Sequence, residues 1–189
     1  MLARGRIGVL VVAMVCAVLY AQAPAVGLSS ATVTISGTST VRNWSCPAEA
    51  AVQVTAGKPG AAVPGFTGGV QSVAFTVPVK AIECDNDTMN EHLRTALKEK
   101  ANPQIVYRMK AYTMAGSGAA TVTGQLTVAG VTRPVTFDVK LTPSANGVRS
   151  QGETTIDMTQ FGVVPPKVLL GQLIVGKMVR VKFDAVLQP

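Results

Sequence analysis

Apolar and polar residues alternate along most of the chain after residue 31, and this period of two is typical of β-strands with one buried face. The clearest run covers 131–142, where Val135, Phe137 and Val139 alternate with threonine, aspartate and lysine. The same pattern predicts further strands over 32–44, 49–55, 69–80, 104–113, 119–128, 148–158 and 179–187. About eight such strands must bury a common apolar face, so the pattern predicts an all-β protein.

Turn signals separate these runs and indicate that neighbouring strands pair antiparallel. Asn146-Gly147 is a strong hairpin signal, and further reversals are expected at 116–118 and 129–130. Two longer stretches, 58–69 and 163–171, contain glycine and proline and predict irregular loops. Without an internal repeat or a dividing linker, one domain is expected. Both a two-sheet sandwich and a closed barrel satisfy the pattern.

One segment departs from the β pattern and predicts a short amphipathic helix between two strands. Its apolar residues fall on a single helical face: Met89, Leu93, Ala96 and Leu97. Thr88 and Glu91 have the spacing of a capping box, which places the helix start near them. Pro103 follows the helix and prevents its continuation.

The N-terminal residues have the organisation of a secretory signal peptide. Arg4 and Arg6 precede an apolar run over 7–19, and Ala21-Gln22-Ala23 provides a small-x-small cleavage pattern. An alternative cut lies at Ala23-Pro24-Ala25, and a retained membrane anchor is the other interpretation. The sequence thus predicts a signal peptide over 1–23, a short linker over 24–30, a domain over 31–189, and a periplasmic or secreted protein.

Composition and charge argue against nucleic-acid binding. The chain has 189 residues, of which 48% are hydrophobic and 14% charged, and its formal net charge is +7. Removal of Arg4 and Arg6 leaves 15 basic and 10 acidic residues, a net charge of +5 that is spread along the chain. This mild charge allows transient contact with an anionic membrane surface, but there is no basic cluster of the kind that binds nucleic acid. Nothing in the pattern indicates an oligomeric state.

Cys46 and Cys84 remain after the predicted leader is removed, and Cys16 lies within that leader. A pair of cysteines in an exported domain indicates a disulfide. A zinc site that adds His92, or two free buried thiols, are the alternatives.

We expect no catalysis and no cofactor. His92 is the single histidine and lies on the expected exposed face of the helix, without a partner nucleophile in its neighbourhood of the sequence. The chain contains no Gly-rich phosphate loop, no G-x-S-x-G elbow and no cluster of metal ligands.

The segment 124–135 carries a resemblance to a known family. Its Leu126-Thr127, Gly130-Val131-Thr132 and Pro134-Val135 resemble the signature of the YceI-like family, whose members are exported, lipocalin-like and associated with polyisoprenoid binding. The helix with its following strand and the Phe161-Gly162 pair agree with the family in order and spacing. The region 37–44 departs from many members, which carry histidines there, and resembles a branch with a tryptophan and paired cysteines.

The resemblance implies an antiparallel eight-stranded lipocalin-like barrel with one short helix inserted between strands. It also implies an isoprenoid or other long-chain apolar lipid as the bound partner, held without catalysis. The alternative is a ligand-free structural or interaction module of the cell envelope, in which inward side chains fill the barrel. The residues expected to line the cavity are Trp44, Phe75, Tyr107, Met109, Leu126, Phe137, Val139, Ile156, Phe161, Val181 and Phe183.

Overall fold

The structure, a computed structural model, describes residues 26–57, 62–168 and 172–189. Within these ranges the chain is built almost entirely of β-strands, with one α-helix and two short 3₁₀ turns. The predicted signal peptide and its cleavage site lie outside the described residues. The strands are β1 (Val26–Ser39), β2 (Trp44–Ala56), β3 (Val70–Pro78), β4 (Gln104–Met114), β5 (Ala119–Val128), β6 (Val131–Ser144), β7 (Gly147–Asp157), β8 (Lys167–Val168) and β9 (Leu173–Leu187).

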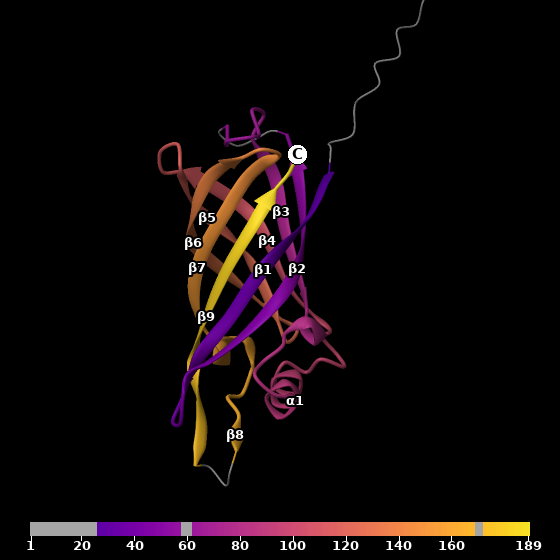
Figure 1. Cartoon of the computed structure of the whole chain (residues 1–189), viewed down its shortest axis with the longest axis vertical. Coiled ribbons are helices and arrows are strands. Elements are labelled where there is room, and N and C mark those ends of the chain that lie inside the picture. The colour runs from indigo at the N-terminus through magenta and orange to yellow at the C-terminus, as the bar shows by residue number, and fades with distance from the viewer. Residues whose placement is uncertain (1–25, 58–61, 169–171) are drawn as a thin grey trace, which may run out of the picture.

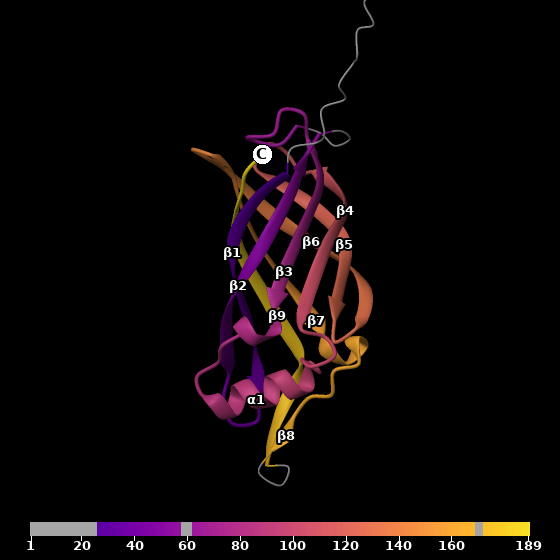
Figure 2. The ribbon, with the colours of Figure 1, turned by 90° about the vertical axis from the view of Figure 1, so that its right-hand side faces the viewer.

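The eight long strands form a closed antiparallel barrel (Figures 1 and 2). They are paired in chain order from β1 to β7, then β7 pairs with β9, and β9 pairs with β1 to close the sheet. The two-residue β8 pairs with β9 alone and lies beyond the barrel end. The barrel prediction is confirmed, and closure excludes the sandwich because it leaves no edge strand among the eight.

Two expectations about the first strands differ from the structure. The linker assigned to 24–30 is wrong over residues 26–30, which already belong to β1 and pair with 51–55 of β2. The single strand expected over 32–44 is interrupted by a turn at 40–43, so that Trp44 begins β2. The Ser39 hydroxyl holds this turn, since it donates to the Arg42 carbonyl at 2.8 Å and accepts from the Arg42 N–H at 3.1 Å. Pairing with a long neighbour extended β1 further than its own sequence indicated.

The other reversals follow their turn signals closely. Turns occupy 115–118, 129–130 and 145–146, where hairpins were expected. Ala129 and Gly130 both have positive φ, 48° and 83°, which matches the right-handed twist of the strands they join. The turn chemistry of the sequence therefore set the antiparallel order of the barrel.

The two ends of the barrel differ. The upper end in Figure 1 is closed by the loop before β3, where Val63 and Phe66 form a β-bridge and are buried. The lower end carries the helix α1 (Asp87–Ala96), the 3₁₀ turn η2 (Met158–Phe161) and the β8 hairpin (Figures 1 and 2). A further 3₁₀ turn, η1 (Val79–Ala81), follows β3. Any access to the interior is therefore expected at the α1 end.

The predicted helix is confirmed, but its cap is Asn86 rather than Thr88. The Asn86 side chain accepts a hydrogen bond from the Met89 N–H at 3.0 Å, and its backbone is extended as an N-cap requires. Thr88 lies inside the first turn, so the capping box expected with Glu91 is wrong. In the described part of the chain, no helix has the length and hydropathy needed to span a membrane.

Candidate functional site

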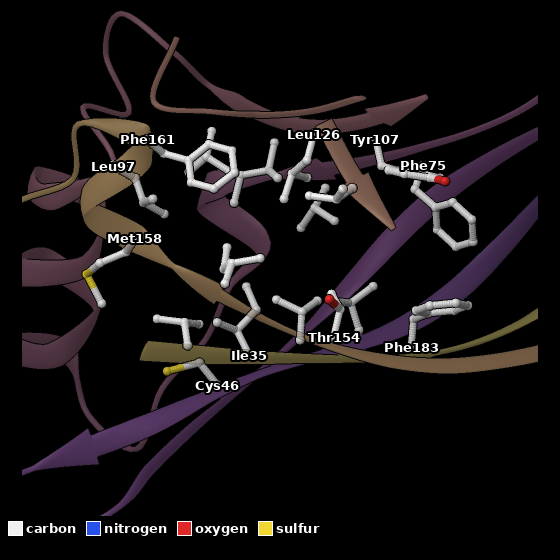
Figure 3. A pocket seen from close by; sticks show the side chains of 18 of the residues that line it. Ile35, Cys46, Phe75, Leu97, Tyr107, Leu126, Thr154, Met158, Phe161 and Phe183 are labelled. Carbon is white, nitrogen blue, oxygen red and sulfur yellow. The ribbon is translucent and has the colours of Figure 1, made fainter. Parts of the chain in front are cut away.

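The barrel contains an apolar cavity of about 560 Å³. Figure 3 shows its side chains in sequence along the bore, from Leu97, Met158 and Phe161 at one end to Phe75 and Phe183 at the other. Exposed polar residues, among them Arg42, Asn86, Thr88 and His92, line the cavity at its α1 end. The mouth therefore lies between α1 and the β1–β2 turn.

Strand alternation builds the wall. In register, Ile35 of β1 lies opposite Cys46 of β2 and Val181 of β9, and all three line the cavity. On the far side of the barrel, Tyr107 of β4 lies opposite Leu126 of β5. Because inward positions fall on every second residue, the period of two seen in the sequence becomes a continuous apolar lining.

Partial burial of the inward aromatic rings shows that the interior is hollow. Phe75, Tyr107, Phe137 and Phe183 point into a closed barrel, yet each keeps accessible surface. Since the sheet shields them from outside, this surface faces the internal space. By contrast, Val54 and Val148, near the closed end, have 0% exposure. The side chains at the closed end are thus tightly packed, whereas the four aromatic rings border the internal space.

These four rings form a closed cycle, which we call the aromatic tetrad. Successive ring centroids are 6.3 Å apart for Phe75–Tyr107, 5.4 Å for Tyr107–Phe137, 5.7 Å for Phe137–Phe183 and 5.4 Å for Phe183–Phe75. The interplanar angles lie between 53° and 72°, so the rings meet edge to face or tilted. These are favourable aromatic geometries, worth about 0.5–1.5 kcal/mol per pair beyond area burial.

Two glycines on neighbouring strands make room for the tetrad. A β carbon at Gly124 would lie 2.5 Å from the Tyr107 ring, and one at Gly152 would lie 2.6 Å from the Phe183 ring. Such distances are too short for any side chain, so each ring covers a bare backbone position. Trp44 has the same relation to Gly37, at 2.5 Å, and its indole N–H donates to the Thr38 carbonyl at 3.2 Å.

All eleven residues predicted to line a cavity do line it. The structure adds others that the prediction missed, including Ile35, Cys46, Leu97, Ile105, Thr154 and Met158. Ile35 and Ile105 follow the same alternation as the predicted residues and were within reach of the sequence pattern. Leu97 and Met158 were not, because they come from the helix and the η2 turn, whose placement over the bore depends on the tertiary structure.

The Tyr107 hydroxyl is a polar group within this mostly apolar interior. It is buried and has no hydrogen-bond partner among the described residues. Burial raises the pKa of Tyr107 above its ordinary value, because the charged phenolate would be poorly solvated there. The group therefore stays neutral and contributes bulk, not charge, to the wall.

A disulfide between Cys46 and Cys84 links two chain segments at the mouth. It joins β2 to the segment just before α1, across 38 residues. Each sulfur is bonded to the other, which leaves neither thiolate for the alternative zinc site with His92 or for a free thiol. The Cys84 N–H also donates to the Asn90 side chain at 2.7 Å. The covalent bond and this hydrogen bond together fix α1 beside the opening.

The opposite side of the mouth is fixed by Asp157, which caps η2. Its carboxylate accepts from the Thr159 hydroxyl at 2.6 Å and the Thr159 N–H at 3.0 Å, and pairs with Lys177 at 2.9 Å. The Thr159 and Lys177 hydrogen bonds lower the pKa of Asp157 to about 2. This cap positions Met158 and Phe161, which are both buried and line the cavity.

Polar contacts at the rim are few and exposed. Arg42 pairs with Asp85 at 3.4 Å and donates to the Met89 sulfur at 3.5 Å. His92 is exposed on α1, as expected from the sequence. No group of three or more potential metal ligands occurs within 26–57, 62–168 and 172–189.

Comparison with solved structures supports the fold assignment. BcnA of Burkholderia cenocepacia is 24% identical, with a TM-score of 0.64 over 84% of this chain and 96% of that chain. A polyisoprenoid binding domain from Saccharophagus degradans, implicated in plant cell wall breakdown, is 11% identical, with a TM-score of 0.60 over 84% and 95%. The YCEI protein of Campylobacter jejuni is 20% identical, with a TM-score of 0.50 over 64% and 75%.

Comparison with curated proteins gives no match. A profile of the YceI-like domain, however, matches residues 25–187. This range begins one residue before β1 and ends with the last residue of β9, so it covers the whole barrel together with α1. By this match, and with a closed barrel and an apolar bore, the chain belongs to the YceI-like family.

Proposed function

We propose that the protein is exported and binds an isoprenoid or another long-chain apolar lipid inside its barrel, acting by stoichiometric sequestration or carriage without catalysis. The observation that carries this proposal is the cavity of about 560 Å³, whose aromatic walls keep accessible surface inside a closed barrel. Cavities of this size fall in the range that small-molecule sites occupy.

The energetics favour an apolar guest. An apolar cavity gives water no hydrogen-bond partners, so water gains little by filling it. A hydrocarbon chain gains about 0.8 kcal/mol for each CH₂ that it buries. Because the named wall residues are mostly valine, leucine, isoleucine and phenylalanine, binding strength would come from chain length and not from a polar contact.

Family membership and the disulfide support the same proposal. The Saccharophagus degradans neighbour is described as a polyisoprenoid binding domain. The Cys46–Cys84 bond is of a kind that persists in oxidising compartments, which fits export by the signal peptide predicted over 1–23.

Exposed apolar residues near the mouth suggest where the lipid is taken up. Val41 is 67% exposed, Val164 78% and Ile174 41%. They belong to the β1–β2 turn and to the segments flanking β8, all at the lower end of the barrel in Figure 1. We propose transient contact of this end with a membrane surface, tested by co-flotation with anionic phosphatidylglycerol vesicles. Loss of flotation in Val41→Asp with Ile174→Asp supports the contact, and unchanged flotation contradicts it.

Native mass spectrometry of protein purified from the cells that produce it tests the binding proposal. A co-purifying isoprenoid or quinone, or uptake of added farnesol or geranylgeraniol, supports it. Protein that is empty and rejects both prenyl alcohols favours the ligand-free structural module instead.

A pair of adjacent substitutions provides a matched control. Val181 lines the cavity, while its neighbour Lys182 is exposed on the outer face of β9. Val181→Phe should fill part of the bore and weaken uptake, whereas Lys182→Phe should leave uptake unchanged. Equal effects of the two substitutions would contradict binding inside the barrel.

A further inference from the structure

The aromatic tetrad lies across the bore rather than along its wall. Its rings come from β3, β4, β6 and β9, which are distributed around the barrel, and their centroids form a cycle with sides of 5.4–6.3 Å. A square of that size has a diagonal of about 8 Å, and carbon atoms in contact need about 3.5–4 Å of separation. Tilted ring edges project into that span, so a hydrocarbon chain does not pass.

We propose that the aromatic tetrad limits the length of the bound chain, and that this protein takes prenyl tails of up to about four isoprene units. The inference rests on the proposed function and specifies the class of ligand. A longer tail would leave its remaining units outside the mouth.

The cavity volume gives an upper bound for this number, because it includes the part of the bore beyond the tetrad. A water-sized group occupies about 30 Å³ in a condensed phase, so the whole cavity of about 560 Å³ holds about 19 such groups. Carbon groups of a prenyl tail are of similar size, and four isoprene units contain 20 of them. The tail enters from the mouth near Arg42 and His92 and reaches the tetrad with its far end.

The bore continues beyond the tetrad, which makes the rings a barrier and not the natural end of the barrel. Val73 and Leu141, which lie on the closed-end side of Phe75 in β3 and of Phe137 in β6, also line the cavity. Removal of one ring would therefore join the two parts. Phe183 is the best choice, because Gly152 beneath it would leave an open recess.

Fluorescence of Trp44 offers a direct readout, since it is the single tryptophan of the chain and lines the cavity. Prenyl alcohols of two, three, four, six and nine isoprene units are titrated against the protein. We expect the dissociation constant to fall at least about tenfold per unit up to a limit of at most about four units, and less than about twofold per unit beyond that limit. Affinity that keeps rising at the same rate to nine units overturns the length limit. Binding of none of them overturns the proposed function and the limit together.

Variants distinguish an effect of the tetrad on the chain-length limit from general destabilisation of the barrel. Phe183→Ala and Phe137→Ala should extend the limit by one or more units, whereas Phe66→Ala, which removes a buried ring that does not line the cavity, should leave the limit unchanged. Melting temperatures identify any variant that does not fold. The titrations of the wild-type protein test the length limit independently of the variants. A folded Phe183→Ala protein with an unchanged limit, or a Phe66→Ala protein with the same extension, overturns the role of the tetrad.

Discussion

The ring of Phe183 covers the bare α carbon of Gly152 on the neighbouring strand β7. The two residues are paired in register, and a β carbon at position 152 would lie 2.6 Å from the ring and 3.1 Å from the Asp138 carbonyl oxygen. The ring therefore depends on the absence of a side chain at position 152. A β carbon at Gly124 would likewise lie 2.5 Å from the Tyr107 ring, although Gly124 pairs in register with Met109. The tetrad therefore depends on two glycines that are not themselves part of the cavity lining.

Gly152→Ala should push Phe183 further into the bore and strain the sheet. We expect a destabilisation of about 1–3 kcal/mol, because the barrel side of the new methyl group is occupied by the ring and the other side by backbone. Thermal unfolding measures it, and uptake of geranylgeraniol should fall as well. Gly118→Ala is the control, since its β carbon would meet only the Leu141 carbonyl at an ordinary 3.6 Å. Equal melting temperatures for the two variants would show that Phe183 is not held against Gly152.

Reduction of the Cys46–Cys84 bond should destabilise the barrel by about 3–4 kcal/mol, the loop-closure value for a crosslink of this span. Urea unfolding with and without reductant measures the difference. Thiol counting under denaturation provides the check on the bond itself. The protein without its leader should show no reactive thiol before reduction and two after it, and two thiols before reduction would refute the disulfide.

Asp157 should make stability depend on pH in the acid range. Its pKa in the folded protein is about 2, below the value of about 3.9 in an unfolded chain, so its charged form favours folding. The contribution is complete above about pH 4 and is lost as the pH falls through about 2. Asp157→Asn should lower the melting temperature at pH 7, and the difference from wild type should shrink between pH 4 and pH 2. A difference that stays constant down to pH 2 would rule out the charge as its source.

Tyr107→Phe should stabilise the protein, because it removes a buried hydroxyl that lacks a hydrogen-bond partner among the described residues. We expect a gain of about 1 kcal/mol, or about 2–4 °C in melting temperature. Tyr112→Phe is the matched control with the opposite sign, since the Tyr112 hydroxyl accepts from the Val70 N–H at 3.2 Å. A loss of stability in Tyr107→Phe would show that its hydroxyl is bonded.

Much of the barrel could be predicted from the sequence because the residues of a strand by themselves indicate which of its faces is buried. Alternation of Val135, Phe137 and Val139 with polar neighbours fixes which side chains point inward, whatever the strand pairs with. The same holds for the turn at 129–130, where chain reversal is a property of two residues. Ten of the eleven predicted lining residues lie in strands and follow this local rule, whereas Phe161 lies in the η2 turn.

The predictions that were wrong concern segments whose structure depends on their tertiary surroundings. Residues 26–30 form a strand because 51–55 of β2 lie beside them, and their own composition resembles a linker. Thr88 and Asn86 are both good caps by type, but Asn86 has the extended backbone of an N-cap, whereas Thr88 lies inside the first turn.

By itself the sequence determined which strand side chains point inward and the antiparallel order, and it indicated a Cys46–Cys84 disulfide while a zinc site and free thiols stayed open. Only the tertiary structure decided that the interior is hollow, that it opens beside α1, and that four aromatic rings meet across it. The physical reason is that alternation specifies a direction for each side chain, whereas free volume depends on how strands of a closed, tilted barrel are staggered. That stagger brings Phe75 and Phe183, more than one hundred residues apart in the chain, to within 5.4 Å of each other.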